Sequence, residues 1–147
     1  MGSVLFILND APYGNERAYN GLRLAGAMTA KDGVQVRVFL MADAVGCAKA
    51  GQKVPEGYYN LQLMLGKVLR KGEVALCGTC MDARGLREDE VIEGARRSTL
   101  AQLLGSRPQL QRAAGSDELR GWFREVDLQL TPPGPTRPHI LRPPPLG

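Results

Sequence analysis

Two cysteines spaced three residues apart, Cys77 and Cys80, are the residues of this chain best suited to chemistry. They follow a short apolar run that ends at Leu76, and Arg84 lies four residues beyond the second thiol. Parallel-sheet proteins place reactive groups at the carboxyl ends of strands. A thiol near a cation and a helix start ionises more readily, and the thiolate is the reactive form. The pattern therefore predicts a redox, sulfur-carrying or metal-binding thiol site.

Each residue of this segment has a chemical and a structural interpretation. Cys77 is expected to be the reactive thiol; otherwise it packs as a small apolar side chain at a strand end. Cys80 would form a disulfide with Cys77 or accept sulfur from it, unless it is a bystander in the turn. Arg84 would stabilise a thiolate or persulfide anion or bind an anionic substrate, unless it forms a salt bridge with Asp82, Glu88 or a neighbouring subunit. Asp82 itself is expected to bond the backbone of its own turn.

Three further residues are expected on the same edge of the sheet. Asp10 and Tyr13 lie in a turn-rich loop after the first apolar run, and Cys47 lies in the loop after the second. Loops at carboxyl strand ends converge on one edge, so Cys47 could face Cys77 or lie in the loop without a role. Asp10 could accept a proton or serve its turn, and all three are assigned to the rim of a substrate site.

No metal and no other cofactor is expected. Closed zinc sites use four ligands, and the cysteine pair with Cys47 supplies three. The single histidine, His139, lies in a proline-rich segment. A thiolate metal site remains the less favoured alternative. The sequence contains no glycine-rich phosphate-binding pattern and no serine-hydrolase pattern.

The order of apolar runs and helical spacing predicts an α/β protein. Strands are expected at residues 4–8, 34–40 and 73–76. Helices are expected from a cap at Asn15, from about 57 to 71 with Tyr58 on the inner face, and after Gly85 with acidic residues 88–90 in the first turn. Alternating strands and helices imply βαβ crossovers and a mostly parallel sheet of four to five strands between helical layers, a three-layer α/β/α fold.

The composition changes after residue 104. Eight of the ten prolines lie beyond it. We predict an α/β domain over residues 1–104 and an atypical segment over 105–130 with a short helix and an edge strand. A Pro- and Arg-rich tail over 131–147 is predicted to be extended and disordered.

Charge and hydropathy exclude several function classes. The chain of 147 residues carries a net charge of +4, with 13 Lys and Arg against 11 Asp and Glu through residue 104 and 6 against 4 beyond it. No basic block suggests nucleic-acid binding. No apolar run approaches the ~20 residues that cross a bilayer, and the N-terminus reads as a strand rather than a signal peptide. Three cysteines do not indicate a disulfide framework, so a cytoplasmic protein is expected.

The sequence resembles the DsrE/DsrF-like sulfur-handling family. The resemblance covers roughly residues 3–104 and is carried by the stretches 9–20, 36–48, 57–60 and 77–99. It implies the three-layer α/β/α fold with about five parallel strands, and assembly into homo- or hetero-oligomers. Relay members of the family carry a persulfide on a cysteine at the end of a central strand, which matches Cys77, eight residues before Gly85. After residue 105 the chain departs from the family pattern, as an extension or a frame-shifted reading of the usual end.

These observations lead to one functional hypothesis and one alternative. The protein would carry or transfer sulfane sulfur as a persulfide on Cys77, as a sulfur carrier or sulfurtransferase. Sulfur donor and acceptor proteins or small thiols would be its partners, and it would form a homo-oligomer. The alternative is a non-catalytic oligomeric module of the same fold that uses this surface to bind a protein.

Overall fold

The computed structural model describes residues 2–105 of the chain. Four strands form one sheet: β1 (Gly2–Leu8), β2 (Val34–Leu40), β3 (Glu73–Cys77) and β4 (Ala95–Ser98). They lie in the order β1-β2-β3-β4, and every neighbouring pair is parallel. The predicted α/β class with a mostly parallel sheet of four to five strands is confirmed. The segments predicted for residues 106–147 lie outside the described residues.

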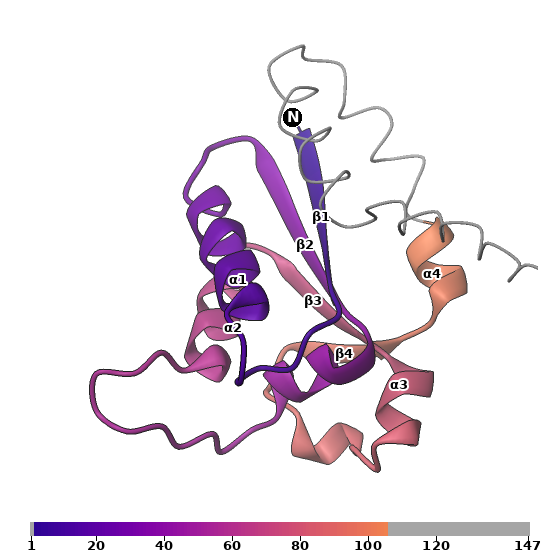
Figure 1. Cartoon of the computed structure of the whole chain (residues 1–147). Helices are drawn as coiled ribbons and strands as arrows, with labels where there is room; N and C mark the ends of the chain where they lie inside the picture. The colour runs from indigo at the N-terminus through magenta and orange to yellow at the C-terminus, as the bar shows by residue number, and fades with distance from the viewer. Residues whose placement is uncertain (1, 106–147) are drawn as a thin grey trace, which may run out of the picture. The chain divides into compact units, whose positions relative to one another are not determined.

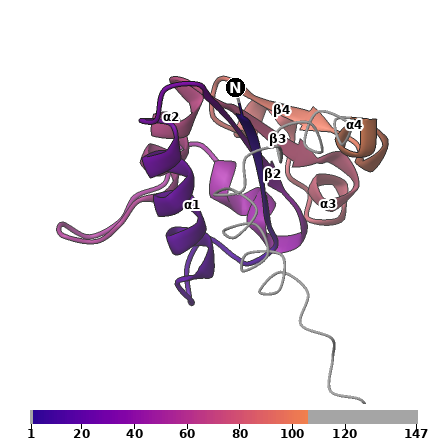
Figure 2. The same cartoon turned by 90° about the horizontal axis from the view of Figure 1, so that it is seen from above.

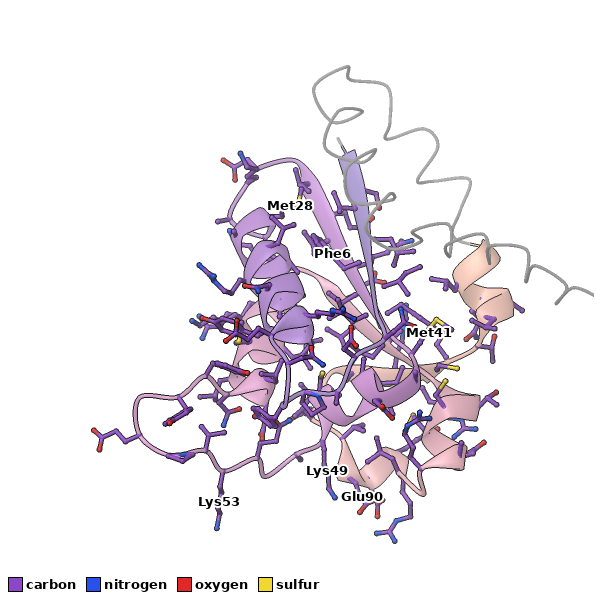
Figure 3. All side chains as sticks on the ribbon, viewed as in Figure 1. Phe6, Met28, Met41, Lys49, Lys53 and Glu90 are labelled. Atoms are coloured by element: carbon purple, nitrogen blue, oxygen red, sulfur yellow. The ribbon has the colours of Figure 1, made fainter. Side chains whose placement is uncertain are left out.

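Two helices, α1 (Arg17–Met28) and α2 (Leu61–Leu69), pack side by side on one face of the sheet (Figures 1 and 2). Right-handed crossovers between strands that follow one another in the sheet place their helices on the same face. Side chains at helical spacing point into this interface and are at most 1% exposed: Ala18, Leu22 and Ala25 from α1, and Leu61, Leu65 and Val68 from α2. The strands contribute alternating apolar residues, among them Phe6, which lies between β1 and α1 (Figure 3).

The opposite face of the sheet borders the start of α4 (Leu100–Gly105). Here Gln102 and Leu103 line a cavity of about 440 Å³ together with strand residues that include Leu5, Arg37 and Phe39. Within residues 2–105, none of the helices has the length and apolar character that crossing a bilayer requires.

The strands agree with the prediction better than the helices do. Asn15 accepts a hydrogen bond from the Arg17 backbone N–H at 3.0 Å and so stabilises the start of α1. The cap residue itself is Glu16, one position later than predicted. The predicted helix start at 57 is wrong. Gly57 has φ +84°, Tyr58 is 71% exposed, and the helix begins after Asn60, whose side chain accepts from the Leu63 N–H at 3.2 Å.

The region after β3 differs most from the prediction. The cysteine segment is a short helix, α3 (Gly78–Ala83), and residues 88–90 form a single 3-10 turn, η2 (Glu88–Glu90). Where a third long helix was predicted, Gly94 has φ +90° and the chain enters β4. The loop after β2 likewise contains a 3-10 helix, η1 (Ala42–Ala48), which packs against β3 and α3. Elements η1 and α3 therefore meet at the carboxyl ends of the strands (Figure 1).

Candidate functional site

Cys77 is the last residue of β3 and the residue that precedes α3. It pairs with Ser98 of β4 in the sheet register, and its backbone is still extended at φ −63° and ψ 113°. The preceding residues Val74 and Leu76 are buried, so the strand is anchored in the core up to the sulfur. Cys77 is only 4% exposed. It thus occupies the predicted strand end, but most of its surface is covered.

Cys80 lies one helical turn after Cys77. Partial removal from water, and then the neighbouring Cys77 thiol, raise the pKa of Cys80, while the Ala42 amide and the Arg84 charge act in the opposite direction. Cys80 is the more exposed of the two. Cys80 therefore stays protonated to a higher pH than a free thiol.

Ala42, at the start of η1, supplies a backbone amide to this pair. Its nearness lowers the pKa of the Cys80 thiol. The residue has φ +46°, and no other non-glycine residue in the described range has a positive φ. Such a conformation costs a side-chain-bearing residue of order 1–2 kcal/mol. Strain of this kind is found where the backbone has to present a group to a site, and here that group is an amide facing sulfur.

Arg84 joins α3 to η1 rather than facing Cys77. Its Nε and Nη2 each lie 2.9 Å from Oδ1 of Asp43, and its Nη1 donates to the Cys80 carbonyl at 3.2 Å. The salt bridge is therefore made with Asp43, not with Asp82 or Glu88. Arg84 fixes the helix that carries Cys80, and its charge opposes the rise in the pKa of that thiol.

Arg97 of β4 is a cation of this site that the sequence reasoning missed. Its Nη1 and Nη2 donate to the two carboxylate oxygens of Asp82 at 2.8 and 2.7 Å, and its Nε lies 3.8 Å from Glu88. Hydrogen bonding to Arg97 lowers the pKa of Asp82, so this carboxylate bonds the guanidinium rather than the backbone of its own turn as predicted. The position of Arg97 beside α3 follows only from the register of β4 against β3. A strand that contains two arginines does not show a typical strand pattern in the sequence.

Cys47 lies in η1 with 0% of its surface exposed. Removal from water raises the pKa of this thiol to about 12. Its backbone carbonyl accepts a hydrogen bond from Nε2 of Gln52 at 2.8 Å. Cys47 is therefore part of the core and not of an open rim.

The buried Cys47 should make the protein less stable in alkali. Because its pKa is about 12 in the folded chain and 9.0 when exposed, the folded state binds the proton more tightly. The stability it contributes is complete below pH 9.0 and is lost as the pH rises towards 12, by about 1.4 kcal/mol per pH unit. Denaturant unfolding between these pH values should show a shallower decline in Cys47→Ala than in the wild type. Equal slopes would contradict the assignment.

Asp10 and Tyr13 do not join the cysteine pair in the described contacts. Asp10 forms an exposed ion pair with Arg17 at 3.7 Å. The Tyr13 hydroxyl donates to Gln52 Oε1 and accepts from the Leu61 N–H at 3.3 Å. Gln52 therefore connects Tyr13 with the Cys47 backbone and the start of α2. The structure brings Cys77, Cys80 and Arg84 into one site and places Tyr13 in a separate network that holds the loops.

The arrangement is suited to thiol chemistry. Two thiols one helical turn apart are spaced for thiol–disulfide exchange, and Arg84 donates to the backbone carbonyl of the second. Among residues 2–105, no group of three or more His, Cys, Asp or Glu is placed to hold a metal ion.

Comparison with known proteins identifies the family. The DsrE/DsrF-like family profile matches residues 2–107. Protein YchN of Escherichia coli is 41% identical over 105 residues, which cover 70% of this chain and 89% of YchN. The chain belongs to the DsrE/DsrF-like family. The uncharacterized protein MJ0989 of Methanocaldococcus jannaschii is 40% identical over 99 residues, or 67% of this chain and 85% of that protein.

Solved structures of the DsrE/DsrF-like fold agree with this assignment. The crystal structure of YchN from E. coli superimposes with a TM-score of 0.68 at 40% identity and covers 71% of this chain and 91% of YchN. MTH1491 of Methanobacterium thermoautotrophicum, a protein of unknown function, gives a TM-score of 0.58 at 13% identity over 74% of this chain and 93% of its own. The second likeness shows the fold alone.

Proposed function

We propose that this protein carries sulfane sulfur as a persulfide on Cys77, as a sulfur carrier or sulfurtransferase. The observation that supports this most is the Cys77–Cys80 pair at the carboxyl end of β3, with Arg84 held next to Cys80. The Cys77 thiolate attacks the outer sulfur of a donor persulfide, R–S–SH. A new S–S bond forms on Cys77 and the donor leaves as R–S⁻.

The surroundings of Cys77 set conditions on this reaction. Cys77 is 4% exposed and Cys80 is the more accessible of the two, so little of the Cys77 surface is open to a donor. The donor and acceptor we propose are protein persulfides or small thiols. We assign the reaction to the cytoplasm, where thiols stay reduced, and to a homo-oligomer of this chain.

Loading with sulfur tests the proposal directly. After incubation of the full-length protein with inorganic polysulfide, the peptide that contains Cys77 should gain about 32 Da, the mass of one sulfur atom. Cys77→Ser should lose the adduct, whereas Cys47→Ala should keep it because Cys47 is buried in the core. The test is peptide mapping by mass spectrometry without reductant. A Cys77→Ser protein that still gains the adduct at the wild-type level would overturn the assignment.

A non-catalytic interaction module is the second candidate. It is favoured by two large apolar side chains that point to solvent, Tyr58 at 71% and Leu63 at 66% exposure. Both lie around the start of α2, away from the cysteines in the sequence. Thiol reactivity separates the candidates, because a module has no use for a reactive sulfur and its cysteines would be alkylated no faster than a free thiol.

A further inference from the structure

The face of the sheet opposite α1 and α2 carries the cavity of about 440 Å³ described above. Both α3 and α4 lie on this side of the sheet (Figures 1 and 2). The lining combines apolar side chains, such as Leu5 and Phe39, with polar ones, such as Arg96 and Ser98. A cavity of this size with an apolar floor and a few converging polar groups is typical of sites that bind small molecules.

The register of the sheet places Cys77 next to this cavity. Ala75 of β3 lines the cavity, and Cys77 lies two positions later on the same strand. Successive side chains of a strand point to opposite faces, so Ala75 and Cys77 face the same side. Cys77 also pairs with Ser98, which lines the cavity from β4, and adjacent strands lie only about 4.8 Å apart. Cys77 is therefore the next position along the cavity floor.

The described residues that line the cavity include three arginines, Arg37, Arg96 and Arg97, against one acidic residue, Glu73. Arg97 is bound by both carboxylate oxygens of Asp82 at 2.8 and 2.7 Å. Arg37 and Arg96 approach the same oxygen of Glu73, Oε2, at 3.6 and 3.1 Å. The Arg96 side chain is 68% exposed, and Glu73 accepts one of its five N–H groups. Arg96 can therefore also bind the carboxylate of a ligand.

We propose that this cavity binds a small thiol that carries a carboxylate, and that the persulfide of this thiol is the sulfur donor of Cys77. The inference rests on the proposed function, because it takes Cys77 as the sulfur that is loaded. The donor R–S–SH, with the carboxylate in R, gives its outer sulfur to the Cys77 thiolate and leaves as R–S⁻.

The spacing of the strand positions limits the size of this ligand. Arg96 lies two residues before Ser98, which is about 6.6 Å along the strand, and Ser98 lies beside Cys77. A carboxylate at Arg96 and a sulfur at Cys77 are then separated by on the order of 10 Å or less. A small peptide thiol of the size of glutathione covers this distance.

Binding of S-methylglutathione tests the site separately from sulfur transfer. This thioether keeps the carboxylates of a peptide thiol but cannot exchange sulfur. Titrated into isotope-labelled full-length protein, it should shift the amide NMR signals of Ala75, Ser98 and Gln102 and leave those of α1 unchanged. Arg96→Gln should raise the Kd about three- to fivefold. Arg70→Gln removes an arginine at the end of α2, on the other face of the sheet, and as the matched control should leave the Kd unchanged.

Two further variants separate a binding role from a structural one. Glu73→Gln removes the carboxylate that competes for Arg96, so it should lower the Kd about two- to threefold. Ala75→Leu fills the cavity floor without changing any charge and should abolish binding. If the Arg96–Glu73 pair only stabilised the sheet, Arg96→Gln and Glu73→Gln would change the Kd in the same direction.

The outcomes distinguish this inference from the proposed function. Absence of shifts at the cavity residues, as expected if a second copy of the chain covers this face, would overturn the inference. Equal effects of Arg96→Gln and Arg70→Gln would overturn it as well. If S-methylglutathione binds as expected but glutathione persulfide and polysulfide add no sulfur to Cys77, the proposed function fails and the binding site stands. If polysulfide loads Cys77 but S-methylglutathione does not bind, the proposed function stands and the inference fails.

Discussion

Cys80→Ser should trap sulfur on Cys77. In the wild type, the Cys80 thiolate can attack the inner sulfur of the Cys77 persulfide, so that the Cys77–Cys80 disulfide forms and hydrosulfide leaves. The two residues lie one helical turn apart, and a reaction between groups held close together is strongly favoured over one with a free thiol. Serine cannot perform this attack. We expect the Cys77 persulfide to last at least about tenfold longer in Cys80→Ser, with a matching loss of released hydrosulfide.

Mass spectrometry of the loaded protein over time measures the persulfide, and capture of free hydrosulfide by a bimane reagent measures its release. Cys47→Ala is the control and should behave as the wild type. If Cys80→Ser releases hydrosulfide at the wild-type rate, Cys80 is a bystander. If the wild type keeps its persulfide and forms no disulfide, Cys80 has no part in resolving it either.

Gly72→Ala should strongly destabilise the fold. Among the described glycines at strand–helix junctions, Gly72 is the one at which an added methyl group should cost most. A β carbon at Gly72 would lie 2.6 Å from the backbone oxygen of Val36 on β2 and 3.1 Å from that of Val68 on α2. Both are main-chain atoms of packed elements and cannot move aside as a side chain can. We expect a loss of about 2–3 kcal/mol in the free energy of unfolding and a drop in Tm of roughly 10 °C.

Gly66→Ala in α2 is the matched control. Nothing lies within 4 Å of a β carbon built there, and the residue is in the interior of α2. Alanine should therefore stabilise the protein by about 0.5–1 kcal/mol. Urea unfolding of both variants measures the difference, and a Gly72→Ala protein as stable as the wild type would show that β2 and α2 are not packed as described.

The first three strands were predictable because they are rich in apolar and β-branched residues. Val34–Leu40 was predicted with its exact bounds, and the other two strands differ from the prediction only at their ends. β4 was missed because its four residues, Ala95–Ser98, include two arginines that face solvent, and helical spacing across this region suggested a helix. Pairing with β3 makes this segment a strand despite its local pattern, and that pairing cannot be predicted from the segment alone.

The sequence indicated where the site lies but not how it is arranged. The position of Cys77 at a strand end was predicted from the sequence, but the helix α3 that places Cys80 one turn later was not. The salt bridge of Arg84 could not be predicted either, because Asp43 is 41 residues away in the chain. The approach of the Ala42 amide to Cys80 and the pairing of Arg97 with Asp82 likewise arise only through tertiary packing. The burial of Cys47 likewise depends on how η1 packs against β3 and α3.

The chain order of the four strands has a consequence for synthesis. Since each strand pairs with the one made just before it, no strand between residues 2 and 105 has to be inserted between two earlier neighbours. The sheet can grow from one side as the polypeptide leaves the ribosome. Cys77 emerges with β3, whereas its sheet partner Ser98 emerges with β4, so the cysteine is made before the strand that pairs with it.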